Sequence, residues 1–221
     1  EIPVEVKNAE DGFSSKLVVG ASTMCLSRLL QIAPIMHNEF PNLRFKLVIG
    51  DSNFLENMLK KRQIDFAIML PASDPEAFET IPLPASPFSV VFSDRLEVEK
   101  DKKAITLDEL RTLPLLVCKR IEGTGVFDNL SRLFKLEGMT PNIVVESPDC
   151  RTIADLIANG MKAAAVIPSS EIPEYIRGKY VVLPLHVPEY SVTPMVVRLK
   201  DHYMTTAAQT MIDHFLAMEE N

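Results

Sequence analysis

The sequence predicts an α/β protein of two lobes, each with a βαβαβ order of elements. Its 221 residues suit one large domain or two domains of about 100 residues each. The order strand, helix, strand, helix, strand precedes residues 81–99 and occurs again after them. Pro82, Pro84 and Pro87 keep the start of this stretch extended, and the run 88–92 is typical of a strand. We therefore expect a crossover between two lobes, with a crevice at the carboxyl ends of their strands where small ligands bind.

The first lobe is predicted from hydrophobic periodicity. Residues 1–15 are polar and aperiodic, and we expect them to be the tail of a linker. Strands are expected at 16–20, 45–49 and 65–70, with Ser22 and Thr23 as N-cap candidates for the first helix. The apolar positions at helical spacing are Leu26, Leu29, Leu30, Ala33, Met36 and Phe40 in the first helix, and Phe54, Leu55, Met58 and Leu59 in the second.

The second lobe repeats this pattern after a short helix. Thr106 and Glu109 have the spacing of a capping box at the start of that helix. Strands are expected at 115–118, 143–146 and 163–167, and Gly138 and Gly160 are expected to end the two longer helices. These helices have apolar residues at Phe127, Leu130, Leu133 and Phe134, and at Ile153, Leu156 and Ile157.

The C-terminal part contains two more predicted strands, at 181–185 and 195–199, and a final helix. A lone terminal helix needs a sheet on which to bury its apolar face, so we expect the strand at 195–199 to return the chain to the first lobe. This predicts a lobe I of residues 17–85 plus 196–221 and a lobe II of residues 88–193.

Composition and charge exclude several classes of protein. No apolar run approaches the roughly 20 residues of a membrane-spanning helix, and the N-terminus lacks the pattern of a secretory signal. The net charge of −7 argues against a nucleic-acid surface on this chain. Three widely spaced cysteines (Cys25, Cys118 and Cys150) fit free thiols in a reducing compartment, so a cytoplasmic location is expected.

Two short motifs and the histidines have simpler interpretations than an enzyme site. Gly50-Asp-Ser-Asn resembles the opening of the GDSL esterase motif, but its histidine partner block is absent near the C-terminus, and a helix-capping turn explains it better. Gly123-Thr-Gly125 lies between a strand and a helix, as in a dinucleotide site, but Asp128 would repel a pyrophosphate there. The four histidines are scattered, without metal-ligand spacing. We expect no catalytic residues, no cofactor and no metal.

Polar residues directly after the predicted strands are the best candidates for a binding site. Most of them lie at a helix start, where unpaired backbone N–H groups and the helix dipole favour an anion, and arginine can bind a carboxylate with two hydrogen bonds. Each alone is explained by a helix cap or a surface charge. Together they predict an effector site formed by Ser22, Thr23, Ser52, Arg120, Thr124, Arg151, Thr152 and Pro168.

Successive blocks of the chain resemble the effector-binding domain of LysR-type transcriptional regulators. The blocks are KLVVGAST, HNEFPNLRFKLVIGDSNFLENMLKKRQIDFAIM, PFSVVFSDRLEVEK with ITLDELRTLPLLVCKRIEGTG, and DLIANGMKAAAVIPSS. The resemblance runs from about Lys16 to the C-terminus, and the order and spacing of the blocks make it specific. One departure is Gly160-Met-Lys162, where the family usually has Gly-x-Gly, with one extra residue before Pro168.

The resemblance implies a fold like the periplasmic binding proteins of type 2, with two lobes joined by two crossover strands. It also implies a small effector in the cleft, pairing of domains into a homodimer or homotetramer, and DNA binding only through an N-terminal helix-turn-helix outside this chain. With the site residues it predicts a sensor of a small organic anion, such as a di- or tricarboxylate. A free-standing solute-binding protein of an importer has the same fold and is the alternative.

Overall fold

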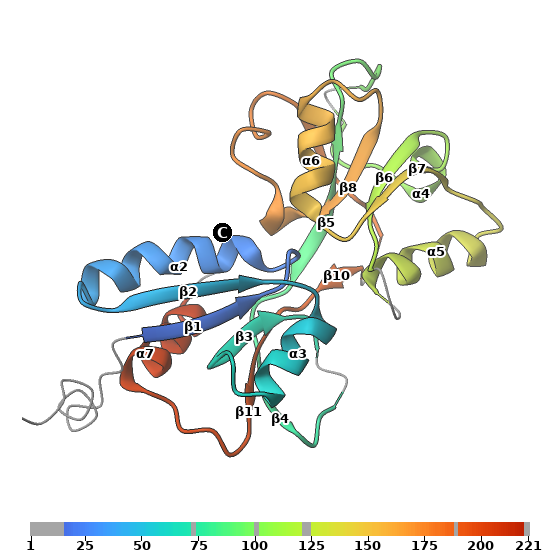
Figure 1. Ribbon diagram of the computed structural model, residues 1–221. Helices are drawn as coiled ribbons and strands as arrows, with labels where there is room; N and C mark the ends of the chain where they lie inside the picture. The colour runs from blue at the N-terminus through green and yellow to red at the C-terminus, as the bar shows by residue number, and fades with distance from the viewer. Residues whose placement is uncertain (1–15, 72–73, 100–101, 121–124, 188–189, 219–221) are drawn as a thin grey trace, which may run out of the picture. The chain divides into compact units, whose positions relative to one another are not determined.

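The computed structural model describes residues 16–71, 74–99, 102–120, 125–187 and 190–218 (Figure 1). These residues form two compact units, and each has its own sheet and core. Unit 1 comprises residues 1–84 and 193–221, and unit 2 comprises residues 85–192. The chain therefore passes between the units twice, after Pro84 and after Val192. The expected linker tail at residues 1–15 lies outside the described residues.

Unit 1 has a five-stranded sheet with the order β2-β1-β3-β11-β4. Its strands are β1 (Lys16–Ala21), β2 (Arg44–Ile49), β3 (Phe66–Met69), β4 (Phe78–Pro82) and β11 (Met195–Leu199). Strand β1 is parallel to β2 and β3, whereas β11 is antiparallel to β3 and β4. The sequence did not predict β4, because Pro82, Pro84 and Pro87 lie at and shortly after its end. Pro82 is nevertheless tolerated, since it ends an edge strand.

Three helices accompany this sheet: α2 (Leu26–Glu39), α3 (Ser52–Lys60) and α7 (Thr206–Leu216). Helix α7 contacts α2, and the ring of Phe215 on α7 meets the ring of Phe66 on β3 edge to face, with the centroids 6.3 Å apart. The predicted apolar stripes are wrong at Leu30 and Phe54, which are exposed.

A core cluster in unit 1 links α3 to the sheet. It consists of Leu55, Leu59, Ile64, Ala67, Met69, Phe78 and Val197. Gly20 on β1 allows this packing, because a Cβ atom there would lie 2.8 Å from side-chain carbons of both Leu55 and Ile64.

Unit 2 has a six-stranded sheet with the path β10-β5-β8-β6-β7, and β9 pairs with β5. The strands are β5 (Ser86–Phe92), β6 (Pro114–Cys118), β7 (Asn142–Ser147), β8 (Ala164–Pro168), β9 (Val181–Pro184) and β10 (Ser191–Val192). Strand β6 is parallel to β7 and β8, so the carboxyl ends of these three strands lie at one edge. Strand β5 is antiparallel to β8 and β9.

The helices of unit 2 are α4 (Leu107–Leu110), α5 (Val126–Leu136), α6 (Cys150–Ala158) and the 3-10 turn η1 (Ser169–Glu171). Three helix boundaries in unit 2 agree with the sequence prediction: the start of α4 and the ends of α5 and α6, whereas the turn η1 was not predicted. Gly138 and Gly160 follow the C-caps of α5 and α6 with φ angles of +67° and +88°, a conformation that favours glycine.

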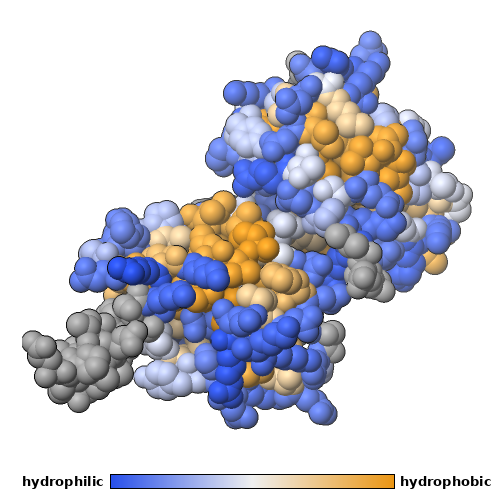
Figure 2. Space-filling view, in the orientation of Figure 1, coloured by the Kyte–Doolittle hydropathy of each residue, from blue (hydrophilic) through white to orange (hydrophobic). Residues whose placement is uncertain are grey.

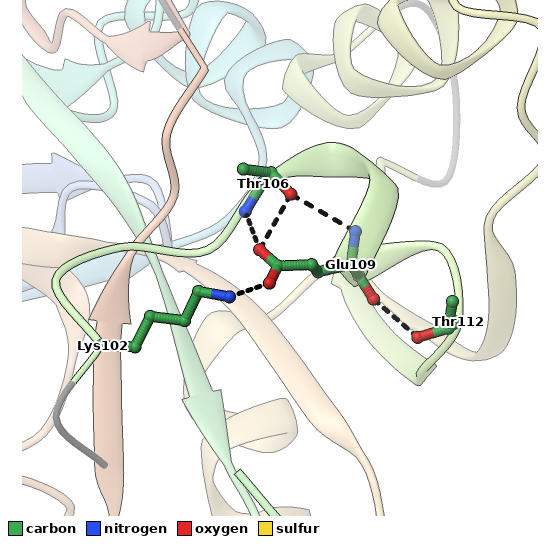
Figure 3. A network of polar contacts seen from close by, with 4 residues as sticks. All are labelled: Lys102, Thr106, Glu109 and Thr112. Carbon is green, nitrogen blue, oxygen red and sulfur yellow. Dashed lines mark hydrogen bonds and ion pairs between the residues drawn. The ribbon is translucent and has the colours of Figure 1, made fainter. Parts of the chain in front are cut away.

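The capping box before α4 is confirmed (Figure 3). The Thr106 hydroxyl accepts a hydrogen bond from the Glu109 N–H at 3.4 Å, and the Glu109 carboxylate accepts one from the Thr106 N–H at 2.9 Å. Lys102 forms an ion pair with the same carboxylate. Within the described residues, no helix combines the length and apolarity that a membrane span requires.

Candidate functional site

In unit 1, the carboxyl ends of β1 and β2 lie side by side, and polar residues follow each strand. The N–H of Gly50, after β2, donates to the carbonyl of Ala21 at the end of β1 over 3.2 Å. Ser22 follows β1 and Ser52 begins α3; both are buried. The structure therefore places Ser22 and Ser52 at one edge of this sheet.

The predicted N-cap residues of α2 are wrong. The N-cap of α2 is Cys25 rather than Ser22 or Thr23. The Ser22 N–H continues the sheet by donating to the carbonyl of Ile68 at 2.9 Å, and its hydroxyl donates to the Cys25 sulfur at 3.2 Å. The turn before α2 is therefore longer than the sequence suggested.

Arg28 is a residue of this edge that the sequence prediction missed. It lies in the first turn of α2, is only 8% exposed, and donates from Nη2 to the carbonyl of Pro84 at 2.5 Å. Its Nε is buried and lacks a hydrogen-bond partner among the described residues. The sequence does contain a signal, because Arg28 shares a helical face with Ile32 and Met36, which are both buried.

In unit 2, the candidate residues follow the parallel strands β6, β7 and β8. Arg120 comes two residues after β6, Arg151 and Thr152 lie in the first turn of α6 after β7, and Pro168 ends β8. The structure brings these four residues to one edge of the sheet. Thr124 lies outside the described residues.

The individual environments of these residues differ. The Arg120 side chain lies against Gly125, at 3.2 Å from the position of a Cβ there. The Tyr175 hydroxyl donates to the Asp155 carboxylate, and the Arg151 guanidinium lies near the same hydroxyl. Burial, followed by the Asp155 carboxylate, raises the pKa of Tyr175 above its ordinary value, so the phenol remains a protonated donor at neutral pH.

Aspartates already occupy the N-termini of three helices. Asp51 accepts from the Phe54 N–H at 2.8 Å on α3, and Asp128 accepts from the Gly125 N–H at 2.5 Å on α5. On α6, Asp149 accepts from the N–H groups of Arg151 and Thr152, both at 3.1 Å. This corrects the expectation that the N–H groups at these helix starts are unpaired.

Helix α2 has no such aspartate, either at its N-cap or in its first turn. Its N-cap residue, Cys25, makes no side-chain capping hydrogen bond, and its first turn contains no acidic residue. It instead contains the buried cation Arg28, which the positive end of the helix dipole disfavours. A bound anion would compensate the charge of Arg28 and the partial positive charge at the N-terminus of α2.

Serines between β5 and η1 form a second polar feature that the prediction missed. The hydroxyls of Ser89 and Ser169 are 2.7 Å apart, and the Ser170 N–H donates to the Ser86 hydroxyl at 3.0 Å. Ser86 and Ser89 are buried. The run Pro-Ser-Ser after a buried strand was the available signal. Within the residues that the structure describes, no group of three or more His, Cys, Asp or Glu side chains is placed to hold a metal ion.

Comparison with known proteins identifies a family and a set of structural neighbours. The family model described as LysR substrate binding domain matches residues 10–219. The HTH-type transcriptional regulator BsdA of Bacillus subtilis (strain 168) is 24% identical over 212 residues, which cover 96% of this chain and 72% of that regulator.

Three solved structures are similar to the chain. Full-length CbnR complexed with its target DNA has a TM-score of 0.77 at 17% identity, covering 96% of this chain and 73% of that chain. The BenM effector binding domain with its effector benzoate has a TM-score of 0.71 at 18% identity, covering 90% of both chains. The effector binding domain of QuiR in complex with shikimate has a TM-score of 0.70 at 17% identity, covering 91% of this chain and 95% of that chain. These likenesses confirm the predicted α/β fold, of the periplasmic binding protein type 2 kind.

Proposed function

The chain belongs to the LysR substrate binding domain family, and we propose that it senses a small organic anion for a transcriptional regulator. The match of the family model to residues 10–219 is the observation that carries the regulatory role. The relatives are transcriptional regulators, and none of the comparisons supports the importer alternative.

The anionic character of the effector is inferred mainly from α2. A buried arginine in the first turn of a helix carries a desolvation cost, and the helix dipole adds to it. Arg28 has a buried Nε without a partner among the described residues, so one donor of its guanidinium lacks an acceptor. A carboxylate is the ligand group that matches this donor in charge and geometry.

The remaining predicted residues are proposed as further contacts in each unit. Ser22, Thr23 and Ser52 would supply hydroxyls from unit 1. Arg120, Thr124, Arg151, Thr152 and Pro168 would contribute from unit 2. Two of the neighbouring domains were solved with small molecules, benzoate and shikimate, which each have one carboxylate. For this chain, the proposal therefore covers monocarboxylates as well as the di- and tricarboxylates expected from the sequence.

The proposal extends to the whole regulator. This chain spans 72% of BsdA, and the structural neighbour CbnR was solved on its target DNA. We propose that DNA binding belongs to a helix-turn-helix outside this chain, and that the domain acts as a homodimer or homotetramer.

Ligand-dependent stability tests the anion proposal. The chain is titrated with a panel of aromatic, alicyclic and aliphatic carboxylates, each paired with its neutral amide, and unfolding in urea is followed. A true effector should add about 2.7 kcal/mol to the free energy of unfolding at a hundredfold excess over its dissociation constant. The matching amide should add nothing measurable. Stabilisation by amides and acids alike, or by cationic amines instead, would refute the anionic effector.

The contribution of unit 2 is tested with Arg151→Ala. Loss of a charge-assisted hydrogen bond worth roughly 1.5 to 3 kcal/mol should weaken effector binding at least about tenfold. Arg132→Ala is the matched control, because Arg132 is an exposed arginine of the same unit. Equal affinity of Arg151→Ala and the parent chain would remove Arg151 from the site.

A further inference from the structure

Two buried cysteines meet at the carboxyl edge of the sheet in unit 2. Cys118 ends β6 and Cys150 begins α6, and their sulfur atoms are 2.6 Å apart. Their residues are 7% and 1% exposed, respectively. The remaining cysteine, Cys25, is buried in unit 1 beside Ser22.

This contact is close enough for covalent chemistry. A disulfide bond is about 2.05 Å long, so bond formation would require the sulfurs to approach by only about half an ångström. The two residues are 32 positions apart in the sequence, and the contact is made by the packing of α6 against β6. We propose that Cys118 and Cys150 form a reversible disulfide when the domain meets a hydroperoxide.

The reaction can be written in two balanced steps. The Cys118 thiol loses its proton and its sulfur attacks one oxygen of the peroxide; the O–O bond breaks, and the leaving oxygen takes up a proton to depart as water or an alcohol. This gives a sulfenic acid on Cys118. The Cys150 sulfur then attacks the Cys118 sulfur, the S–O bond breaks, and the oxygen leaves as water with the proton of the Cys150 thiol. The two thiols lose two electrons in total, and the peroxide gains them.

The greater exposure of Cys118 makes it the first residue to react, with Cys150 as the resolving thiol. The hydrogen bond with Cys118, and then burial, raise the pKa of Cys150 well above its ordinary value, and the nearby Glu171 and Asp149 carboxylates act in the same direction. Cys150 is therefore protonated at neutral pH. Because a thiolate is the attacking species, disulfide formation should accelerate as the pH rises.

The pair lies next to the proposed effector contacts of unit 2. Cys118 precedes Lys119 and Arg120, and Cys150 precedes Arg151 and Thr152. Oxidation would covalently join the end of β6 to the start of α6. The expected consequence, a change in effector affinity, rests on the proposed function, whereas the disulfide itself does not.

Oxidation of the folded chain by hydrogen peroxide tests the proposal. The expected product has lost two hydrogen atoms per chain in its intact mass, and digestion without reduction yields one peptide pair that joins Cys118 to Cys150. Dithiothreitol should restore the original mass. Cys118→Ser and Cys150→Ser should each abolish this product, and Cys25→Ser should leave it unchanged.

A serine variant identifies which cysteine reacts first with the peroxide. Cys150→Ser should retain a sulfenic acid on Cys118 that a dimedone probe traps, which would identify the first thiol to react. Oxygen addition to sulfinic or sulfonic acid in the parent chain, or a disulfide that involves Cys25, would overturn the proposal. So would an absence of reaction in the folded chain when the urea-unfolded chain reacts. Each of these results leaves the anionic effector untouched, because carboxylate binding is measured on the reduced chain.

Discussion

Among single residues, Arg28 is the one whose position most needs a functional explanation. It is buried on the face of α2 that also buries Ile32 and Met36, and its Nη2 hydrogen-bonds to the carbonyl of Pro84, the last residue before the chain leaves unit 1. A structural role would be served as well by an apolar side chain, since replacing buried charges by packed apolar groups is often neutral or stabilising.

We predict that Arg28→Met separates binding from stability. The variant should weaken binding of the carboxylate effector at least about tenfold, because a hydrogen bond to a charged group is worth roughly 1.5 to 3 kcal/mol. The midpoint of urea unfolding without ligand should stay the same or rise, since a buried cation is removed. Arg132→Met serves as the exposed control. A large loss of stability with unchanged affinity would instead assign Arg28 a purely structural role.

The burial of Arg28 shows that sequence patterns predict some parts of a binding site poorly. Residue types after strand ends correctly placed Ser52, Arg151 and Thr152 at helix starts. The partners of their backbone groups were not predictable, because Asp51 and Asp149 compete for the same N–H groups that a ligand would use. Arg28 was missed because hydrophobic periodicity identifies the buried face of a helix by its apolar residues. A charged residue on that face is therefore not recognised as buried.

The stability of the folded chain at alkaline pH should depend on Cys150 and Tyr190. The pKa of Cys150 is raised above its ordinary value of 9.0, and burial raises that of Tyr190 above its ordinary value of 10.0. The folded state therefore retains protons that the unfolded chain loses, so stability from both groups is complete below about pH 9 and declines as the pH rises beyond it.

Urea unfolding midpoints between neutral pH and about pH 10 measure this effect. The midpoint should fall above about pH 9 in the parent chain, and Cys150→Ser should reduce the fall. Cys25→Ser is measured in parallel as a control, because Cys25 is a buried cysteine of unit 1. A parent midpoint that rises through this interval would contradict the sign of both shifts.

At the scale of single elements, α4 depends on its capping box. The helix is only four residues long, so it gains little from its own hydrogen bonds, and the reciprocal bonds of Thr106 and Glu109 define its start (Figure 3). The ion pair of Glu109 with Lys102 is partly exposed and should add little.

We expect Thr106→Ala to lower the free energy of unfolding by about 1 kcal/mol, the typical value for loss of a capping hydroxyl. Thr106→Ser keeps the hydroxyl and should cost much less. Chemical denaturation of the three proteins measures the difference. Equal destabilisation by serine and alanine would show that the methyl group, rather than the cap, stabilises this turn.

Element boundaries were predictable wherever a local signal fixes the backbone. The capping box, Gly138 and Gly160 are such signals, and the structure confirms all three. The exposed faces of elements were not predictable in the same way. The strand at 45–49 was predicted, but the exposure of its apolar residues was not: Leu47 and Ile49 are 40% and 43% exposed on β2, which is an edge strand of its sheet.

These exposed residues predict how the domain self-associates. Leu47 and Ile49 on β2, with Leu30 and Ile35 on α2, are exposed large hydrophobic residues of unit 1, and Figure 2 shows hydrophobic residues gathered over this region. An edge strand also presents unpaired backbone groups to a second chain. A second copy of the domain would cover both features in a symmetric contact.

Leu47→Glu should therefore shift the domain toward monomer, because a two-fold contact would bury two new carboxylates. We expect the dissociation constant from sedimentation equilibrium to rise at least about tenfold. Val144→Glu changes an exposed residue on β7, an edge strand of unit 2, and should leave association unchanged. A parent chain that stays monomeric at micromolar concentration, or a larger effect of Val144→Glu, would redirect the search for the interface.

At the scale of the whole molecule, the route of the chain makes the two units unequal. Unit 2 is one continuous segment, residues 85–192, whereas unit 1 is assembled from two segments. The repeated βαβαβ pattern predicted two lobes because each repeat contains enough apolar strands and helices for its own core. The strands β4 and β10 had no such signal, since one ends in proline and the other has only two residues.

Because unit 1 is built from two segments, its fold should depend on the C-terminal one. Strand β11 lies between β3 and β4, so it supplies the ladder partners of both, and α7 buries Ala207, Ala208, Met211, Ile212 and Phe215. A chain that ends at Val192 loses both elements, which leaves β4 without a partner and exposes the face that α7 covers. Its unit 1 should unfold, while unit 2 should keep its fold because all its strands remain.

Hydrogen exchange read by mass spectrometry distinguishes the two units. In the truncated chain, amides of β1, β2 and β3 should exchange at the rate of an unfolded chain, and those of β5, β6 and β8 should stay protected. Residues 85–192 alone are the matched control and should show the protection that unit 2 has in the full chain. Protected β1 and β3 amides in the truncated chain would mean that unit 1 folds without its second segment. Loss of protection in both units would mean that unit 2 depends on unit 1, and that the two cores are one cooperative structure.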